Sequence, residues 1–253
     1  MSLKIQQDRP NPPEGQASEV QERTLATRRA LLLTAERLYA RLGIDGVSLR
    51  EINREAQQKN RSAVHYHFGS REAVIEGIFE MRAAQIDVRR RELLAIMRSR
   101  GTPITLRELI EGLIRPQAEV WQREKGSYHY NRFLAQAALS GRDDLREMWR
   151  KRFEGGLQEY WDAIAGLLPD VPDPLLRQRL VVATDFAIYG LASLEGAVES
   201  RRVAKRAFPF ERAIENLIDM LTASIATAPS DATMIALAEE TQPVRTSRRS
   251  SKK

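Results

Sequence analysis

The chain has 253 residues, with 40 Lys and Arg side chains, 34 Asp and Glu side chains and no cysteine. Disulfides and thiolate metal sites are therefore excluded, and a reducing cytoplasm suits the composition. No run approaches the roughly 18 apolar residues of a membrane-spanning helix, and residues 1–20 lack the apolar core of a signal peptide. We therefore expect a soluble cytoplasmic protein that does not enter a membrane.

The basic charge is concentrated in the N-terminal part of the chain. Residues 21–71 contain ten basic and five acidic side chains, whereas residues 101–228 contain seventeen basic and eighteen acidic ones. A local basic excess can neutralise the phosphates of a nucleic acid. A solvated helix face gives the same composition, so charge alone leaves both interpretations open.

The first predicted helix follows a polar, proline-containing segment. Residues 1–18 are expected to be disordered because prolines and a glycine interrupt them. A helix is then predicted from Glu19 or Thr24 to Leu42, since the apolar residues in its second half recur at helical spacing. Gly43 is expected to end this helix.

Residues 48–69 have the pattern of two short helices joined by a polar turn. Ser48 and Glu51 form a capping box for the first helix. Asn60 is a favourable N-cap for the second helix, and Gly69 suits the left-handed backbone of a helix end. Because the second helix is basic and aromatic, the pattern is typical of a DNA-binding helix-turn-helix.

At these residues the sequence resembles the TetR family of bacterial repressors. The resemblance covers about a fifth of the chain. Its motifs are Thr-Arg-Arg-Ala-Leu-Leu-Leu at 27–33, Leu-Gly-Ile-Asp-Gly-Val-Ser at 42–48 and His-Phe-Gly-Ser-Arg-Glu-Ala-Val-Ile at 67–75. Two features depart from the family pattern. Gln57 and Gln58 stand where Ala-Gly is usual, in a turn one residue longer than the commonest spacing, and His65 stands where Tyr is frequent.

The resemblance implies an all-α fold of about nine helices, with an N-terminal three-helix helix-turn-helix domain and a C-terminal helical domain for ligand binding and dimerisation. We expect the DNA-binding domain at 19–72, the regulatory and dimerisation domain at 73–227, and a basic disordered tail at 228–253. A helix predicted at 70–98 connects the two domains in the resembling family, so its tilt can set the separation of the two DNA-binding domains in a dimer.

Nine residues are predicted to contact the major groove, its rim or the DNA backbone. Arg61 can donate two parallel hydrogen bonds to guanine O6 and N7, whereas Asn60 and Ser62 suit phosphates near the helix N-terminus. His67 suits a phosphate or a base equally. For any one residue, a solvated surface position explains its character as well. The predicted set is Ser48, Lys59, Asn60, Arg61, Ser62, Ala63, His65, Tyr66 and His67.

Beyond residue 101 the apolar pattern remains helical. Helices are expected at 104–124, 128–140, 143–168, 174–200 and 209–227. Pro116 is expected to kink or split the first of them, because it removes an amide donor.

The last two of these helices are strongly apolar, so that they either complete the core or expose a patch for a partner. The resemblance implies that this pair from each subunit forms a four-helix interface in a homodimer, which suits a two-fold operator. The residues predicted at the interface are Leu180, Thr184, Ile188, Leu191, Ile214, Leu217, Ile218 and Leu221.

The C-terminal part also concentrates aromatic residues. Their helical spacing by itself indicates core packing, but the resemblance implies a small effector molecule among these helices, and an apolar wall is typical of such pockets. We predict a small, mostly apolar effector in contact with Trp121, Phe133, Phe153 and Tyr189.

No catalytic residue, cofactor or metal site is predicted. The sequence lacks a nucleophile–base spacing and a phosphate-binding glycine loop. His65 and His67 point roughly 200° apart on a helix and do not share one ion. The expected function is a dimeric, ligand-responsive transcriptional regulator, usually a repressor, that releases a palindromic DNA operator when an effector binds. Two alternatives stay open: a helical DNA-binding regulator with no small-molecule effector, and an apolar-ligand carrier or enzyme.

Overall fold

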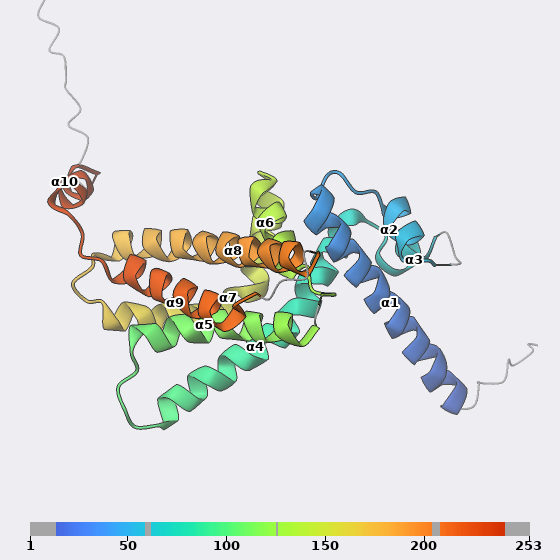
Figure 1. The fold of residues 1–253 in the computed structure, drawn as a ribbon, viewed down its shortest axis with the longest axis horizontal. Coiled ribbons are helices and arrows are strands. Elements are labelled where there is room, and N and C mark those ends of the chain that lie inside the picture. Colours follow the sequence, from blue (N-terminus) through green and yellow to red (C-terminus); the bar gives the residue numbers. More distant parts are fainter. Residues whose placement is uncertain (1–13, 59–61, 125, 204–207, 241–253) are drawn as a thin grey trace, which may run out of the picture. The chain divides into compact units, whose positions relative to one another are not determined.

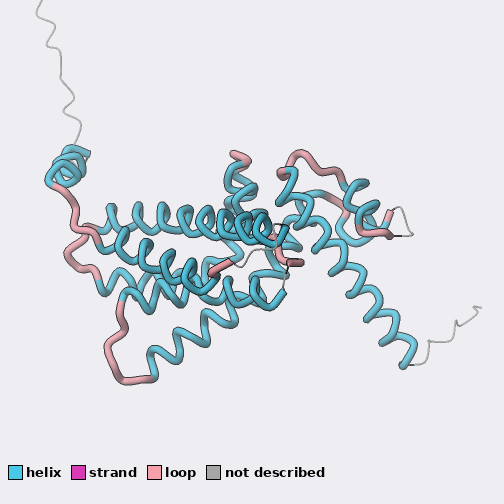
Figure 2. Tube along the Cα trace, viewed as in Figure 1, coloured by secondary structure: helices cyan, strands magenta, loops and turns pink. Residues whose placement is uncertain are grey.

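The computed structural model describes residues 14–58, 62–124, 126–203 and 208–240 (Figures 1 and 2). All regular structure in these ranges is helical, so the all-α prediction is confirmed. The helices are α1 (Glu14–Leu42), α2 (Leu49–Glu55), α3 (Ala63–Phe68), α4 (Arg71–Ser99), α5 (Leu106–Glu124), α6 (Tyr130–Leu139), α7 (Asp143–Leu167), α8 (Asp173–Val203), α9 (Phe210–Ala226) and α10 (Asp231–Glu240).

The predicted helices agree with the structure except near the ends of the chain. α1 begins at Glu14, so the expectation of disorder is wrong for residues 14–18. The expectation of a disordered tail is wrong for residues 231–240, which form α10. α5 continues through Pro116 as one helix and is not split there. Residues 1–13 and 241–253 lie outside the described ranges.

The chain divides into two compact units that do not follow chain order. The first unit contains residues up to 85 together with 120–153, and the second contains 86–119 together with the residues from 154 onwards. Helices α4, α5 and α7 contribute residues to both units. By packing, α6 is grouped with the helix-turn-helix, because it lies against α1. The predicted boundaries of the DNA-binding domain at 19–72 and of the regulatory domain at 73–227 therefore remain a proposal.

The core of the first unit is a run of neighbouring aromatic rings. Successive ring centroids lie 5.4–6.5 Å apart, within the range of favourable aromatic pairs. All six rings are buried, and they come from α1, α4, α5, α6 and the connection between α5 and α6. Phe133 neighbours Phe79, Tyr39 and Tyr130, and from Tyr130 the run continues through Tyr128 to Trp121.

A buried ion pair joins the helices around this aromatic core. Arg82 of α4 and Glu36 of α1 are both fully buried. Arg82 Nε and Nη2 donate to the two Glu36 carboxylate oxygens at 2.6 and 2.8 Å, and Nη1 donates to Glu124 Oε2 at 2.9 Å. Glu36 also accepts from the backbone N–H of His129 at 2.8 Å. The Arg82 guanidinium lies 4.7 Å from the centroid of the Tyr128 ring.

Burial and hydrogen bonding shift the pKa values of Glu36 and Arg82 in opposite directions. Burial raises the pKa of the Glu36 carboxyl, although hydrogen bonds from Arg82 pull it down. Burial by itself lowers the pKa of Arg82, but the hydrogen bonds and attraction of Glu36 outweigh it, and the net pKa of Arg82 is raised. Arg82 therefore carries a fixed positive charge inside the first unit.

In the second unit, a polar junction holds α4, α5 and α7 close together. Gly112 of α5 faces Tyr160 of α7, and a Cβ at Gly112 would lie 2.5 Å from the Tyr160 hydroxyl oxygen. Burial raises the pKa of Tyr160 to about 12, and its hydroxyl donates to the Arg90 carbonyl at 2.8 Å. The Arg90 guanidinium donates to the Leu113 carbonyl at 3.0 Å. This carbonyl is next to that of Gly112, which has no helical N–H donor because Pro116 stands four residues later.

Helices α8 and α9 lie side by side in the second unit (Figure 1). Most of the residues predicted at a dimer interface are buried between elements of this same unit, so they serve its own core. The reason is that periodicity reveals an apolar stripe but not what covers it. The buried residues are Leu180, Leu191, Ile214, Leu217, Ile218 and Leu221, whereas Thr184 and Ile188 are half-buried.

One helix of the described chain, α8, contains a long apolar stretch. By length and composition, residues 173–201 could cross a membrane: their most apolar 18-residue window has a mean hydropathy of 1.3, and 17% of that window is buried. The window contains the charged residues Asp185 and Glu195. Composition alone does not separate a membrane span from a helix with an exposed apolar face.

A substitution at Arg82 tests the buried cluster. Arg82→Met leaves Glu36 as an unpaired buried carboxylate, so we expect a loss of about 3–5 kcal/mol in the free energy of unfolding, measured by urea denaturation. Arg98→Met is the control, because Arg98 forms an exposed ion pair with Glu159 at 2.8 Å and its loss should cost less than about 1 kcal/mol. Equal losses in the two variants would show that the cluster has no special role.

Candidate DNA-binding site

The first short helix of the site begins as predicted. The Ser48 side chain accepts a hydrogen bond from the Glu51 amide at 3.2 Å and caps α2. Ile52 is fully buried on the inner side of α2. Gln57 follows with φ +51°, the one non-glycine residue with positive φ in the described chain. Because the left-handed region favours glycine, the departure at Gln57 introduces a strained position into the turn.

The second short helix is capped by a residue of the first. Asn53 is buried, and its side-chain oxygen accepts a hydrogen bond from the Val64 amide at 3.3 Å. Ser62 occupies the N-cap position of α3 without a side-chain cap bond. The predicted N-cap, Asn60, lies outside the described residues. Asn53 thus satisfies an amide of the first turn of α3 and fixes where α3 begins relative to α2.

Sequence reasoning missed Asn53, although a signal was present. Leu49, Ile52, Asn53 and Ala56 follow the spacing i, i+3, i+4 and i+7, so Asn53 lies within the apolar stripe of α2. A polar residue in such a stripe needs a buried hydrogen-bond partner. The partner itself was not predictable, because it is a backbone amide eleven residues away.

One face of α3 remains open to solvent. Ser62, His65, Tyr66 and Gly69 are all exposed and share the spacing i, i+3, i+4 and i+7. Tyr66 is 80% exposed. A large aromatic side chain at this level of exposure on a short helix is available for contact with a groove. His67 is half-buried, and its ring packs edge-on against Tyr66 with centroids 5.2 Å apart.

The predicted DNA contacts divide into four groups. Ser62, His65 and Tyr66 lie on the exposed face, and His67 lies beside it. Ala63 is 5% exposed, so its predicted contact with the groove is wrong; it faces inward one residue before the buried Val64. Lys59, Asn60 and Arg61 lie outside the described residues. Ser48 is exposed, with its oxygen engaged in the α2 cap.

The inner side of α3 is held by basic residues of other helices. The Arg28 guanidinium of α1 lies 5.1 Å from the centroid of the Phe68 ring and 3.6 Å from Glu80 of α4. Arg71 of α4 donates to the Val47 carbonyl at 3.1 Å. These contacts fix both ends of the helix-turn-helix on the first unit.

Intramolecular pairing reduces the number of cations that can meet phosphates. Most described arginines of residues 21–71 have a carboxylate within ion-pair distance, including Arg37, Arg54 and Arg71. Arg41 and Arg50 are exposed, and no ion pair involving them occurs among the described residues. Arg50, two residues after the cap Ser48, is therefore a candidate phosphate contact that sequence reasoning missed.

The residues predicted to line an effector pocket do not gather in one unit. Trp121 and Phe133 are buried in the aromatic core of the first unit. Tyr189 belongs to α8 in the second unit and is 37% exposed. The Phe153 side chain lies outside the described part of the chain. The pocket therefore stays a prediction.

Two family models match this chain. Residues 31–78 match the model described as bacterial regulatory proteins, tetR family, and residues 111–224 match the model described as tetracyclin repressor-like, C-terminal domain. The chain belongs to the TetR family. This TetR-family transcriptional regulator has the DNA-binding helix-turn-helix of the family at α2 and α3, and α10 lies beyond the matched segments.

One of two similar solved structures shares the fold. A TetR-family transcriptional regulator from Rhodococcus sp. is 18% identical, with 78% of this chain and 99% of that chain covered and a TM-score of 0.51. Another, from Mesorhizobium loti MAFF303099, is 16% identical, with 79% and 97% covered and a TM-score of 0.43. No curated protein matches the chain in sequence.

The cap from Asn53 gives a test of how α3 is held. Asn53→Ala removes the acceptor for the buried Val64 amide, so we expect a loss of about 1–3 kcal/mol in stability and faster hydrogen exchange at Val64. The matched control is Asn216→Ala, because Asn216 is exposed on α9 and its loss should change stability by less than about 0.5 kcal/mol. Unchanged exchange at Val64 in Asn53→Ala would refute the capping role.

Proposed function

We propose that this regulator binds a palindromic operator as a homodimer, represses transcription there, and releases the DNA when a small, mostly apolar molecule binds. The observation that carries the proposal is the exposed face of α3, with Tyr66 at its centre. The other side of the helix-turn-helix is held by contacts of Arg28 and Arg71. A dimer presents two such faces, and a two-fold operator matches them.

In this proposal, phosphate contacts position the protein and side chains of α3 read the bases. Tyr66 and His65 project from the exposed face of α3, and Arg50 and Ser48 lie at the start of α2, where phosphates are expected. Arg61, just before α3, is assigned the bidentate contact with guanine.

The dimer is proposed to use the outer faces of α8 and α9. Val181 and Val182 are 55% and 61% exposed on α8, and Met220 is 47% exposed on α9. Exposed apolar residues on neighbouring helices are typical of a surface that a partner covers. These residues replace the buried ones that periodicity favoured.

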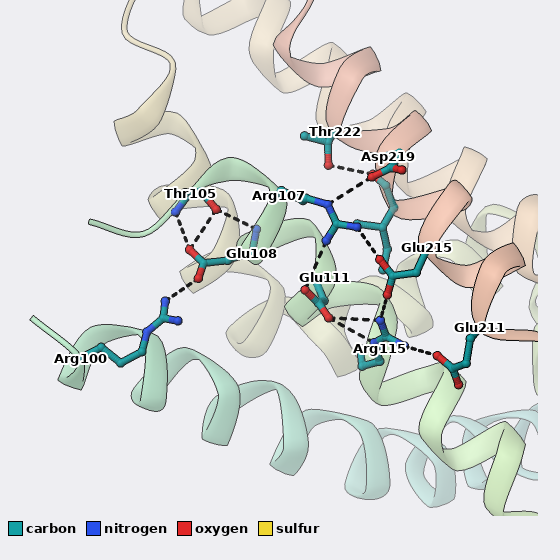
Figure 3. A network of polar contacts seen from close by, with 11 residues as sticks. Arg100, Thr105, Arg107, Glu108, Glu111, Arg115, Glu211, Glu215, Asp219 and Thr222 are labelled. Atoms are coloured by element: carbon teal, nitrogen blue, oxygen red, sulfur yellow. Dashed lines mark hydrogen bonds and ion pairs between the residues drawn. The ribbon is translucent and has the colours of Figure 1, made fainter. Parts of the chain in front are cut away.

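An ionic network determines which face of α9 is left outward. On α5, Arg107 and Arg115 pair with Glu215 of α9, and Arg115 also donates to Glu211 at 2.8 Å (Figure 3). Hydrogen bonds from Arg107 lower the pKa of Glu215, so the carboxylate stays charged at neutral pH. With this acidic stripe held against α5, the residues near Met220 remain free for a second subunit.

Release by an effector is proposed to act through the helices that both units share. α4, α5 and α7 each contribute residues to the helix-turn-helix unit and to the unit with α8 and α9. An effector that binds one arrangement of these helices more tightly than another shifts the population toward it. Repression ends if the favoured arrangement no longer matches successive major grooves of the operator.

Operator binding is the first test. The purified protein should bind its promoter-proximal DNA with two chains per site and discriminate it from random DNA across a salt series. Arg61→Ala should weaken specific binding by about 1–3 kcal/mol, and Tyr66→Ala should also weaken it. Arg91→Ala is the control, because Arg91 is exposed on α4 in the second unit. Equal affinity for both DNAs, or equal effects of all three variants, would contradict the assignment of α3 as the reading helix.

A panel of apolar small molecules tests the effector. A ligand that binds the native state raises the melting temperature, by an amount that corresponds to about 2.7 kcal/mol at a concentration one hundred times its Kd. The same ligand should release the operator at matching concentrations. If DNA binding is confirmed and no ligand in a broad panel shifts the melting temperature, the regulator without a small-molecule effector is favoured. If ligands bind but operator binding fails, the carrier or enzyme is favoured.

A further inference from the structure

The short connection between α6 and α7 carries an arginine that reaches the residues flanking the helix-turn-helix. The connection turns at Gly141, whose φ of +67° lies in the left-handed region that favours glycine. Arg142 follows, with a side chain that is 26% exposed. Its Nε and Nη2 donate to the two carboxylate oxygens of Asp144 at 3.1 and 2.6 Å. This bidentate bond fixes the guanidinium at the start of α7.

Two further carboxylates meet Arg142 from the two ends of the helix-turn-helix. Arg142 Nη2 donates to Glu72, at the start of α4, at 3.1 Å. Its Nη1 lies 3.9 Å from Asp45, in the connection between α1 and α2. Asp45 comes shortly before the cap Ser48, and Glu72 comes shortly after Gly69, where α3 ends. Arg142 therefore contacts both the segment that enters α2 and the segment that leaves α3.

A second arginine closes the helix-turn-helix independently of Arg142. Arg71 donates to the Val47 carbonyl at 3.1 Å and to Asp45 at 3.4 Å, so it joins the two ends of the motif to each other. Because this link remains when Arg142 is replaced, the helix-turn-helix is expected to keep its own fold. Arg142 adds a contact between this closed motif and the start of α7.

The charges of the cluster depend on Arg142. Its hydrogen bond lowers the pKa of Asp144, and the pKa of Glu72 is lowered by its own backbone amide and by Arg142, so both carboxylates stay charged at neutral pH. With Asp45, three carboxylates lie within 3.9 Å of this one guanidinium. Without it they would face one another, and their repulsion would separate the α1–α2 connection, α4 and α7.

Helix α7 extends from this cluster into the second unit. Its residues up to 153 belong to the first unit and those from 154 onwards to the second. In the second unit, Tyr160 of α7 donates to the Arg90 carbonyl of α4 at 2.8 Å. A helix is a rigid element that can carry a coupling between distant sites. Arg142 thus stands at the start of an element that both units share.

We propose that Arg142 is a positioning residue for DNA binding, because by holding Asp45 and Glu72 it fixes the orientation of α2 and α3 against α6 and α7. The inference rests on the DNA binding under Proposed function, and it names a residue outside the helix-turn-helix on which that binding depends. The contact joins the segments that match the two family models, with Asp45 and Glu72 in residues 31–78 and Arg142 in residues 111–224.

A distance measurement within one chain tests this orientation without DNA. The chain contains no cysteine, so spin labels can be attached at His65→Cys on α3 and Leu139→Cys at the end of α6, both exposed positions of the first unit. Excess unlabelled protein restricts the measurement to pairs within one chain. Pulsed electron paramagnetic resonance should give a narrow distance distribution. Arg142→Met and Glu72→Gln should each widen it, because α3 can then shift relative to α6.

Two matched controls change neighbouring residues outside the cluster. Arg150→Met replaces an exposed arginine of α7 that donates to Glu147 of the same helix at 2.8 Å. Glu76→Gln changes an exposed residue one turn after Glu72. Both controls should leave the distance distribution unchanged. An equally narrow distribution in Arg142→Met, or equal widening in the controls, overturns the proposal.

Binding to the promoter-proximal DNA separates this inference from the function on which it rests. In unlabelled protein, Arg142→Met and Glu72→Gln should each reduce the preference for this DNA over random DNA by about fivefold or more, whereas the controls should not. If the distribution widens and the preference is unchanged, Arg142 does not position the motif for DNA, and the proposal fails. If the unsubstituted protein has no preference, the proposed function fails, and the distances still decide whether Arg142 holds the helix-turn-helix.

Discussion

The first unit is organised by one buried positive charge. A guanidinium without water needs acceptors in its plane, and Arg82 finds them in Glu36 and Glu124 while its face lies over Tyr128. Each acceptor comes from a different helix, so the geometry is met only when α1, α4 and the end of α5 hold fixed positions. Replacing such a cluster with apolar side chains is often neutral for stability. Its contribution is therefore best understood as specifying one arrangement of the helices that carry the helix-turn-helix.

The same logic recurs at smaller scale where polar groups fix the orientation of a helix. Asn53 fixes where α3 begins, and the pairing of Arg107 and Arg115 with Glu215 fixes the rotation of α9. Apolar packing alone tolerates small rotations of a helix, because its stripe is wide. A hydrogen bond or an ion pair depends on distance and direction, so a small rotation of the helix breaks it. The two surfaces proposed for recognition, the outer face of α3 and that of α9, are thus each defined by a polar contact on the side that faces the protein.

Much of this fold was predictable from sequence, and the failures share a cause. Caps and periodicity located α4 to α9 closely, and Ser48 caps α2 as expected, because these signals are local. Periodicity gave Leu217 and Ile218 an apolar stripe, which the family resemblance assigned to a dimer, but their own unit covers them; Ala63, assigned to the groove with the rest of the second short helix, is also buried. An apolar stripe reports that a face will be covered; the covering surface depends on contacts distant in sequence. Glu36 and Arg82 are 46 residues apart, and neither has a local pattern that indicates the other.

The departure at Gln57 bears on how the recognition helix is presented. A non-glycine residue at φ +51° costs roughly 1 kcal/mol relative to glycine in the left-handed region, so the turn retains this conformation only because its two sides are anchored. On one side Gln58 donates from its backbone to the Asn53 carbonyl at 3.4 Å; on the other, Asn53 accepts from Val64 through its side chain. A single residue thus bridges both ends of the longer turn. Because Gln58 and Val64 both bond to Asn53, α3 keeps its place against α2.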